Sequence, residues 1–195
     1  MKTRLVTTDP RYRRGAMLSD CGRYRYILER AWDDAAPRCV FIMLNPSVAD
    51  ANVDDPTIRR CLGFALRAGC GALRVVNLFA FRATSPDAMK KAHDPIGPEN
   101  DAMLRGVMRR AIADGGPIVA AWGALGAHLD RDKAVADMAA QHGLTLVCLG
   151  KNGNGSPRHP LYVAADQPFE AWPGDVPAIE PTSGALGVAK VSDDE

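Results

Sequence analysis

The side chains with the clearest chemical potential lie in the sequence GNGSPRHPLY, residues 153–162. Gly153 and Gly155 allow a ligand to approach the backbone closely, and backbone N–H groups in such loops suit phosphate. Three polar side chains follow that could contact an anion or a sugar, namely Ser156, Arg158 and His159. Leu161 and Tyr162 come next, and they could form an exposed apolar wedge or fold back into the core.

Two asparagines lie beside apolar runs, where an amide must find partners. Asn45 follows FIML, so with Pro46 and Ser47 it could tie down a turn, or it could position a water or a substrate. Asn77 lies within RVVNLFAF, where an unpaired amide costs about 1–3 kcal/mol. Its partner could be the backbone or the polar edge of a nucleobase. Two nearby aromatic residues fit the core and could alternatively stack on a base, namely Phe79 and Phe81.

Three aspartates follow Asn45 at short spacing. Asp55 precedes Pro56 and is expected to cap a helix, because Asp at the N-cap and Pro at the first helical position are both favoured. Asp50 and Asp54 could act as a general base or as ligands of a hard metal ion, or could be solvated loop acids. The five cysteines have no C-x-x-C spacing, so we expect reduced and mostly buried thiols rather than a metal site.

Four short apolar runs are expected to form buried strands that position these side chains. They are RCVFIML at 38–44, LRVVNLF at 73–79, PIVAAWG at 117–123 and LTLVCLG at 144–150. Residues 23–32 have strand-like content with an ambiguous period, and 83–98 is expected to be a loop with a helical turn. Helices are expected over 56–68, 99–113 and 124–142, with glycines at or just beyond their ends.

Strands that alternate with helices predict an α/β fold, with a central, mainly parallel sheet of about four strands and helices on both faces. Ligands in such folds bind beyond the carboxyl ends of the strands. This rule selects four segments, namely 45–47, Asn77, Trp122-Gly123 and 153–162. Polar groups that are far apart in the sequence should therefore meet at one edge of the sheet.

Composition and charge set the broad class of the protein. The chain has 195 residues, 47% of them hydrophobic and 24% charged, which predicts one domain over 1–172 and a flexible acidic Pro/Gly tail over 173–195. Residues 1–30 carry eight basic and three acidic side chains, which indicates a basic face for a polyanion or simply a solvated end. No membrane-length apolar run or signal-like N-terminus occurs, so we expect a cytoplasmic protein.

Five ordered blocks resemble a bacterial family of unassigned function, the domain-of-unknown-function family DUF1643, over roughly residues 16–170. They are FIMLNPSVADANVDDPTIRRC, VVNLFAFRAT, DPIGPEND, AAWG and GSPRHPLY. More distantly, the same blocks resemble the uracil-DNA glycosylase superfamily, which has a three-layer α/β/α fold with a parallel sheet. MLNPS is similar to the Gly-Ile-Asn-Pro-type turn of its mismatch-specific branch, and this places Asn45 in the water-positioning role. The catalytic Asp of the uracil-specific enzymes has no counterpart here.

Two further blocks extend this resemblance. Val75-Val76-Asn77 is similar to a strand that ends in a base-reading Asn, and Trp122-Gly123 is similar to a Trp-Gly pair that precedes a helix. Residues 158–161 resemble, in a shortened form, a His-Pro-Ser-Pro-Leu loop whose His faces the base and whose Leu enters the DNA stack. The resemblance thus implies a DNA glycosylase of base-excision repair, a hydrolase that flips a damaged or modified base into a pocket.

The implied roles follow from that chemistry. Asn77 would bind the base edge, with Phe79 or Phe81 stacked on it, and Asn45 would orient water at C1′ with Asp50 or Asp54. His159 would stabilise the departing base, and Leu161 or Tyr162 would fill the gap left in the stack. The phosphate-binding residues would be Ser47, Ser156 and Arg158, and the remaining substrate contacts would be Pro46, Trp122 and Gly123. The expected partner is single- or double-stranded DNA, bound by a monomer with no membrane, metal or organic cofactor.

Three other functions fit the same residues. An N-glycosidase acting on free nucleosides or nucleotides would use the same pocket, without an exposed Leu161 or a basic face. A non-catalytic module would bind nucleic acid or a nucleotide without turnover. A metal-dependent phosphohydrolase would use Asp50, Asp54 and Asp55.

Overall fold

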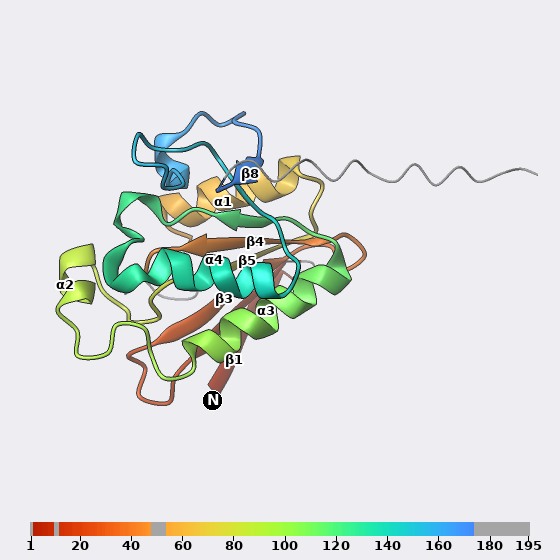
Figure 1. Ribbon diagram of the computed structural model, residues 1–195. Helices are drawn as coiled ribbons and strands as arrows, with labels where there is room; N and C mark the ends of the chain where they lie inside the picture. The colour runs from red at the N-terminus through yellow and green to blue at the C-terminus, as the bar shows by residue number, and fades with distance from the viewer. Residues whose placement is uncertain (1, 10–11, 48–53, 174–195) are drawn as a thin grey trace, which may run out of the picture.

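The computed structural model describes residues 2–9, 12–47 and 54–173. One sheet of eight strands, in the order β1-β2-β3-β5-β4-β6-β7-β8, runs through the molecule (Figure 1). The strands are β1 (Lys2–Asp9), β2 (Tyr12–Leu18), β3 (Arg25–Ala31), β4 (Arg38–Met43), β5 (Ala72–Asn77), β6 (Ile118–Ala120), β7 (Leu146–Cys148) and β8 (Glu170–Trp172).

The centre of the sheet is parallel and its two sides are antiparallel. β5, β4, β6 and β7 are parallel neighbours, and they are the four buried strands expected from the apolar runs. β1, β2 and β3 continue the sheet beyond β5 as an antiparallel meander, and β8 pairs antiparallel with β7. The α/β class is therefore confirmed, whereas the expectation of a mainly parallel sheet of about four strands is wrong.

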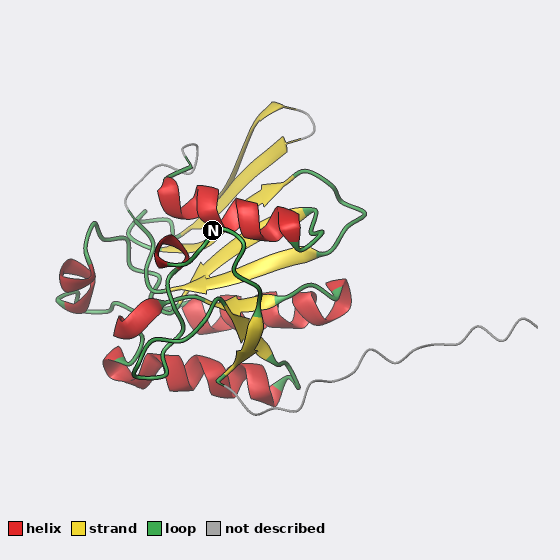
Figure 2. Cartoon of the chain, turned by 90° about the horizontal axis from the view of Figure 1, so that it is seen from above, coloured by secondary structure: helices red, strands yellow, loops and turns green. Residues whose placement is uncertain are grey.

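Helices cover both faces of the sheet, as the view in Figure 2 shows. One face carries α1 (Pro56–Arg67), and the other carries α3 (Asn100–Asp114) and α4 (Arg131–Gln141). Shorter helical segments connect these elements: α2 (Pro86–Lys90), η1 (Gly123–Leu125), η2 (His128–Asp130) and η3 (Pro160–Tyr162).

Alternation along the central strand explains why both faces are covered. In β4, Cys39 and Phe41 pack into the cluster on the α1 side, while Val40 and Ile42 pack into the cluster that includes α3 and α4. Each of these side chains is almost fully buried. Burying a large apolar side chain contributes about 1.5–3 kcal/mol, so a strand that is apolar on both faces is stable only between two helical layers.

The first two expected helices are confirmed with their end signals. Asp55 caps α1 by accepting a hydrogen bond from the Ile58 backbone N at 2.8 Å, and Pro56 is its first residue. α3 ends at Gly115, whose φ of 68° is left-handed. This geometry is the reason that a glycine is favoured at the end of a helix.

The helix expected over 124–142 is shorter in the structure. α4 begins at Arg131, after η1 and η2, and the backbone is left-handed at Leu129 and Asp130, with φ of 55° and 50°. A Cβ on Gly126 would lie 2.1 Å from Cδ1 of Trp122, so the chain there packs against the Trp122 ring instead of winding into a regular helix.

Three strands were not predicted from the sequence, namely β1, β2 and β8. β2 is half-buried along most of its length and does not alternate, and β8 has only three residues, so neither shows the pattern of a buried strand. The cysteines are free, and four of the five are buried, as expected. Within the described ranges, no helix is long and apolar enough to cross a membrane. Residues 174–195 of the expected tail lie outside those ranges.

Candidate functional site

A pocket of about 400 Å³ opens at the carboxyl ends of the parallel strands β4, β5 and β6. Its walls come from the ends of these strands, from β3, from the starts of α1 and α2 and from the loops after β6 and β7. The lining residues are Arg25, Met43, Leu44, Asn45, Ser47, Asp55, Thr57, Ile58, Val75, Asn77, Pro86, Trp122, Gly123, Ala124, Leu125, His159 and Tyr162.

Topology explains why the pocket forms here. After β4 the chain crosses through α1 to β5 on one side of β4, and later crosses through α3 to β6 on the other side. The connection that leaves β4 runs through α1 toward β5, and the one that leaves the neighbouring β6 runs through α4 on the other face toward β7, so the two diverge and create a crevice outside the carboxyl ends of β4 and β6. Ligands of open α/β sheets bind at such a point.

The pocket brings together seven of the residues that were expected to act in a site. They come from four separate segments of the sequence, and they are Asn45, Ser47, Asn77, Trp122, Gly123, His159 and Tyr162. The sequence rule that placed a ligand beyond the strand ends therefore selects side chains that line one cavity.

Asn45 is held in place through its amide nitrogen. Nδ2 donates to the backbone O of Pro46 at 3.1 Å and to the backbone O of Ala83 at 3.3 Å. This arrangement is the turn-stabilising role that an Asn after a strand can play. Because both amide protons are directed to carbonyls, Oδ1 is the atom with which Asn45 can accept a hydrogen bond from a water or a ligand.

Asn77 is almost fully buried, and its Nδ2 has no hydrogen-bond partner among the described residues. Its backbone is fixed from the far side of the sheet, because Nδ2 of Asn100 donates to the backbone O of Asn77 at 3.1 Å and to that of Leu78 at 2.9 Å. A buried amide without a partner is costly, and a ligand with a polar edge would satisfy it.

His159 lies between the pocket and η3. Its Nδ1 accepts a hydrogen bond from the backbone N of Leu161 at 3.3 Å, so the neutral ring carries its proton on Nε2. A Cβ on Gly123 would lie 3.7 Å from Cβ of His159, so the loops after β6 and β7 meet here. Burial lowers the pKa of His159, and the Asp55 carboxylate opposes this shift. A neutral donor at Nε2 is therefore the expected state near pH 7.

This lowered pKa predicts how stability depends on pH. Between the folded-state pKa and the ordinary value of 6.5, the unfolded chain binds more protons than the folded one at His159. The free energy of unfolding should therefore fall as the pH is lowered from about 7 through this window, and the loss should end below the folded-state pKa. Urea unfolding at several pH values should show a shallower slope for His159→Gln; equal slopes would contradict the assignment.

Arg25, which the sequence analysis did not select, lines the pocket with only 7% of its surface exposed. Its Nε has no hydrogen-bond partner among the described residues. The pKa of Arg25 is lowered to about 10, chiefly by burial and also by the charges of Arg82 and Arg30, while Asp55 opposes the shift. Nothing in RYRYILERAW distinguishes this arginine from its neighbours, so only the folded structure identifies it.

The neighbouring acids Asp54 and Asp55 have different surroundings. Asp54 is ion-paired with the buried Arg30 at 2.7 Å and with Arg14 at 3.6 Å, and it does not line the pocket. Asp55 lines the pocket while its Oδ1 caps α1. Asp50 lies outside the described residues. The available carboxylate is thus the one that the sequence analysis assigned to helix capping.

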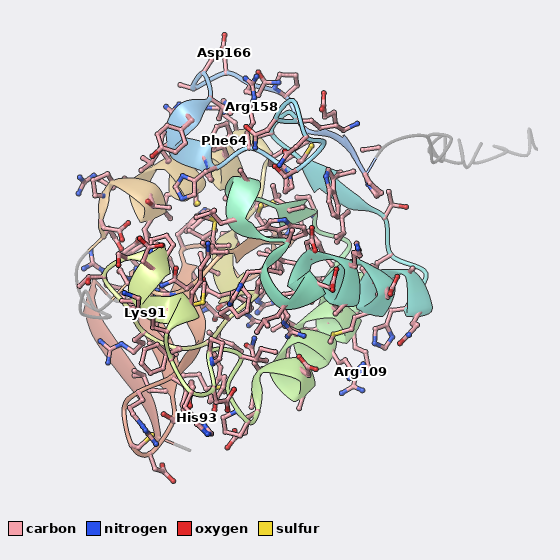
Figure 3. The ribbon with its side chains drawn as sticks, turned by 60° about the vertical axis from the view of Figure 1, so that its left-hand side comes forward. Phe64, Lys91, His93, Arg109, Arg158 and Asp166 are labelled. Carbon is pink, nitrogen blue, oxygen red and sulfur yellow. The ribbon has the colours of Figure 1, made fainter. Side chains whose placement is uncertain are left out.

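Several other expected residues lie away from the pocket lining. Phe79 is fully buried in the core, and Phe81 lines a second cavity that also includes Tyr24 and His93. Arg158 is absent from the pocket lining, and Nε of Arg158 donates to the backbone O of Lys151 at 3.1 Å. In Figure 3, Arg158 lies far from His93 of the second cavity. Three more are absent from the lining, namely Pro46, Ser156 and Leu161.

The arginines of the first thirty residues do not all contribute to a basic face. Arg13 is ion-paired with Asp34, and both Arg14 and Arg30 are ion-paired with Asp54. Arg25 lies in the pocket. In the part of the chain that the structure describes, no group of three or more His, Cys, Asp or Glu side chains is arranged to hold a metal ion.

Comparison with known proteins gives one family. A family model described as a protein of unknown function, DUF1643, matches residues 25–161, which include every described part of the pocket lining except Tyr162. No curated protein and no solved structure matches the chain.

Proposed function

The chain belongs to the DUF1643 family, and we propose that its pocket hydrolyses the N-glycosidic bond of a damaged or modified base flipped out of DNA. One observation carries this proposal. Asn45, Asn77 and His159 come from three distant segments and line one pocket at the topological switch point of the sheet. With helices on both faces, this arrangement supports a three-layer α/β/α fold like that of the uracil-DNA glycosylases.

The reaction needs a water, a proton acceptor and a group that stabilises the leaving base. Asn45 Oδ1 and the Asp55 carboxylate orient the water, and Asp55 accepts its proton as the water oxygen bonds to C1′. The bond from C1′ to the base nitrogen breaks, and its electron pair leaves with the base. The Nε2–H of His159 stabilises the negative charge on the base, which then takes a proton from solvent.

The remaining groups bind the substrate. The amide of Asn77 pairs with the polar edge of the base, because its buried Nδ2 otherwise has no partner among the described residues. Tyr162 at the pocket mouth is 79% exposed, and Leu161 beside it is 40% exposed. Exposed apolar side chains of this kind can occupy the space that a flipped base leaves in the stack.

A base-release assay tests the proposal. The protein would be incubated with duplex and single-stranded oligonucleotides that carry uracil, hypoxanthine, xanthine, hydroxymethyluracil or bulky modified pyrimidines, and abasic sites would be detected by alkaline cleavage. Asn45→Ala should lower the rate by about 100-fold, because it removes the water-orienting Oδ1. The control is Arg158→Ala, because Arg158 does not line the pocket. This substitution should lower the rate of base release by much less than 100-fold. Full activity of Asn45→Ala would exclude this role for Asn45.

A second candidate is an N-glycosidase that acts on free nucleotides. The observation that favours it is the pairing of Arg13, Arg14 and Arg30 with aspartates, which leaves fewer cations for a polyanion. Leu161→Ala distinguishes the two functions. It should reduce release from duplex DNA if Leu161 enters the stack, and it should leave release from a free nucleotide unchanged.

A further inference from the structure

The buried guanidinium of Arg25 lines the pocket but takes no part in the reaction steps proposed above. We propose that Arg25 forms a phosphate subsite, so that the pocket binds its substrate through a nucleotide phosphate as well as through the base. This inference rests on the proposed function, and it specifies the part of the substrate that lies beside the base and the sugar.

The backbone buries this side chain beside the pocket. The register between β2 and β3 shifts at this point, because Met17 pairs with Ile27 and the next residue, Leu18, pairs with Arg25. β3 therefore has one extra residue, Tyr26, in a bulge. A bulge interrupts the alternation of a strand and redirects its side chains. Both Arg25 and Tyr26 are consequently buried, and Arg25 reaches the pocket.

The charges around Arg25 favour the binding of an anion beside its guanidinium. No ion pair within 4 Å joins Arg25 to an acid among the described residues, and Arg82 and Arg30 are close enough to lower its pKa. The acid whose charge opposes this shift is Asp55, whose Oδ1 is held by the amide of Ile58. A buried cation with so little compensation is costly unless a ligand supplies the negative charge.

The start of α1 adds to this preference. Thr57 lines the pocket at the second position of this 12-residue helix, whose N-terminal end carries a partial positive charge. A guanidinium with five donors matches the oxygens of a phosphate in a fork geometry. In a nucleotide the phosphate is ionised at neutral pH, whereas sugar and most bases are not. A phosphate is therefore the anion that this substrate class can offer to Arg25.

The test measures binding without turnover. The full-length protein, labelled with ¹⁵N, would be titrated at constant ionic strength with inorganic phosphate, 2-deoxyribose 5-phosphate and 2-deoxyribose. A fourth titration would use an oligonucleotide that contains a tetrahydrofuran abasic analogue, and Arg25→Lys would identify the Arg25 Nε–H resonance. The expected result is a saturable shift of that resonance by the phosphate-bearing probes and none by 2-deoxyribose.

Affinity of the variants completes the test. Arg25→Gln should bind the best phosphate probe at least about tenfold more weakly, and Arg25→Lys should retain part of the affinity. A shift with 2-deoxyribose 5-phosphate alone would indicate a free nucleotide as the source of the phosphate, and a shift with the oligonucleotide alone would indicate DNA. An unchanged resonance with every probe, or equal affinity in Arg25→Gln, would overturn the subsite.

This outcome is independent of the base-release assay. Base release without phosphate binding at Arg25 would reject the subsite and leave the proposed function intact. Phosphate binding that depends on Arg25, with no base release from any substrate, would keep the subsite and reject the hydrolysis.

Discussion

Asp55→Asn should lower the rate of base release by about 100-fold or more while it keeps the cap of α1. Asparagine caps a helix about as well as aspartate, so the hydrogen bond to the Ile58 amide can be kept. The substitution nevertheless removes the carboxylate that accepts a proton from water, and general bases typically contribute 100-fold or more. Single-turnover base release and thermal unfolding, measured side by side, would separate the two effects.

Asp87→Asn is the matched control for this prediction, because it makes the same chemical change at an exposed acid in the first turn of α2 that does not line the pocket. It should leave both the rate and the stability unchanged. A wild-type rate in Asp55→Asn would show that the carboxylate takes no part in the reaction. A large loss of stability would show that the capping geometry or the negative charge beside Arg25, rather than the chemistry, requires Asp at this position.

Asp54→Ala should instead reduce stability and leave the reaction rate unchanged. We expect it to lower the free energy of unfolding by about 3 kcal/mol. Asp54 accepts a 2.7 Å hydrogen bond from Nε of Arg30, whose side chain is 0% exposed, so its removal leaves a buried cation without this carboxylate. Urea unfolding would measure the loss. We expect base release by the folded variant, measured below its unfolding transition, to remain close to that of the wild type.

Asp34→Ala provides the comparison for this loss. Asp34 is ion-paired with Arg13 where both side chains are well exposed, and such pairs contribute at most about 1 kcal/mol. A similar, small effect of Asp54→Ala and Asp34→Ala would mean that Arg30 finds compensation elsewhere. If the Asp54→Ala protein folded but had lost base release, Asp54 would have to take part in the reaction, as a general base would.

Sequence alone predicts the centre of this fold well. The four parallel strands are continuous apolar runs, since each must be buried on both faces, and this pattern does not depend on distant residues. The same reasoning places Asn45, Asn77, Trp122-Gly123 and His159 near each other, because the carboxyl ends of parallel strands share one edge of the sheet. Those residues indeed line the pocket.

Other features depend on contacts that sequence patterns do not record. Arg25 reaches the pocket because of a bulge, and no residue type near it signals the irregularity. Asp54 and Asp55 are adjacent and chemically identical, but the partners that separate them, Arg30 and the Ile58 amide, become evident only in three dimensions. β2 was missed because a half-buried strand within a meander needs no apolar run, and β8 because a strand of three residues is too short to show one.

The contacts behind Asn77 have a consequence for how the pocket can move. Asn100 on α3 and Arg131 at the start of α4 both donate to the carbonyl of Leu78, at 2.9 Å and 2.8 Å. The end of β5, which borders the pocket, is thus anchored to the two helices α3 and α4. Among the hydrogen bonds of the described residues, η3 is attached to α1 through Arg60 alone, whose guanidinium donates to the carbonyls of Pro160 and Val163. Adjustment to a ligand should therefore occur as a hinge-like displacement of η3 and its connecting loop, against an end of β5 that stays fixed.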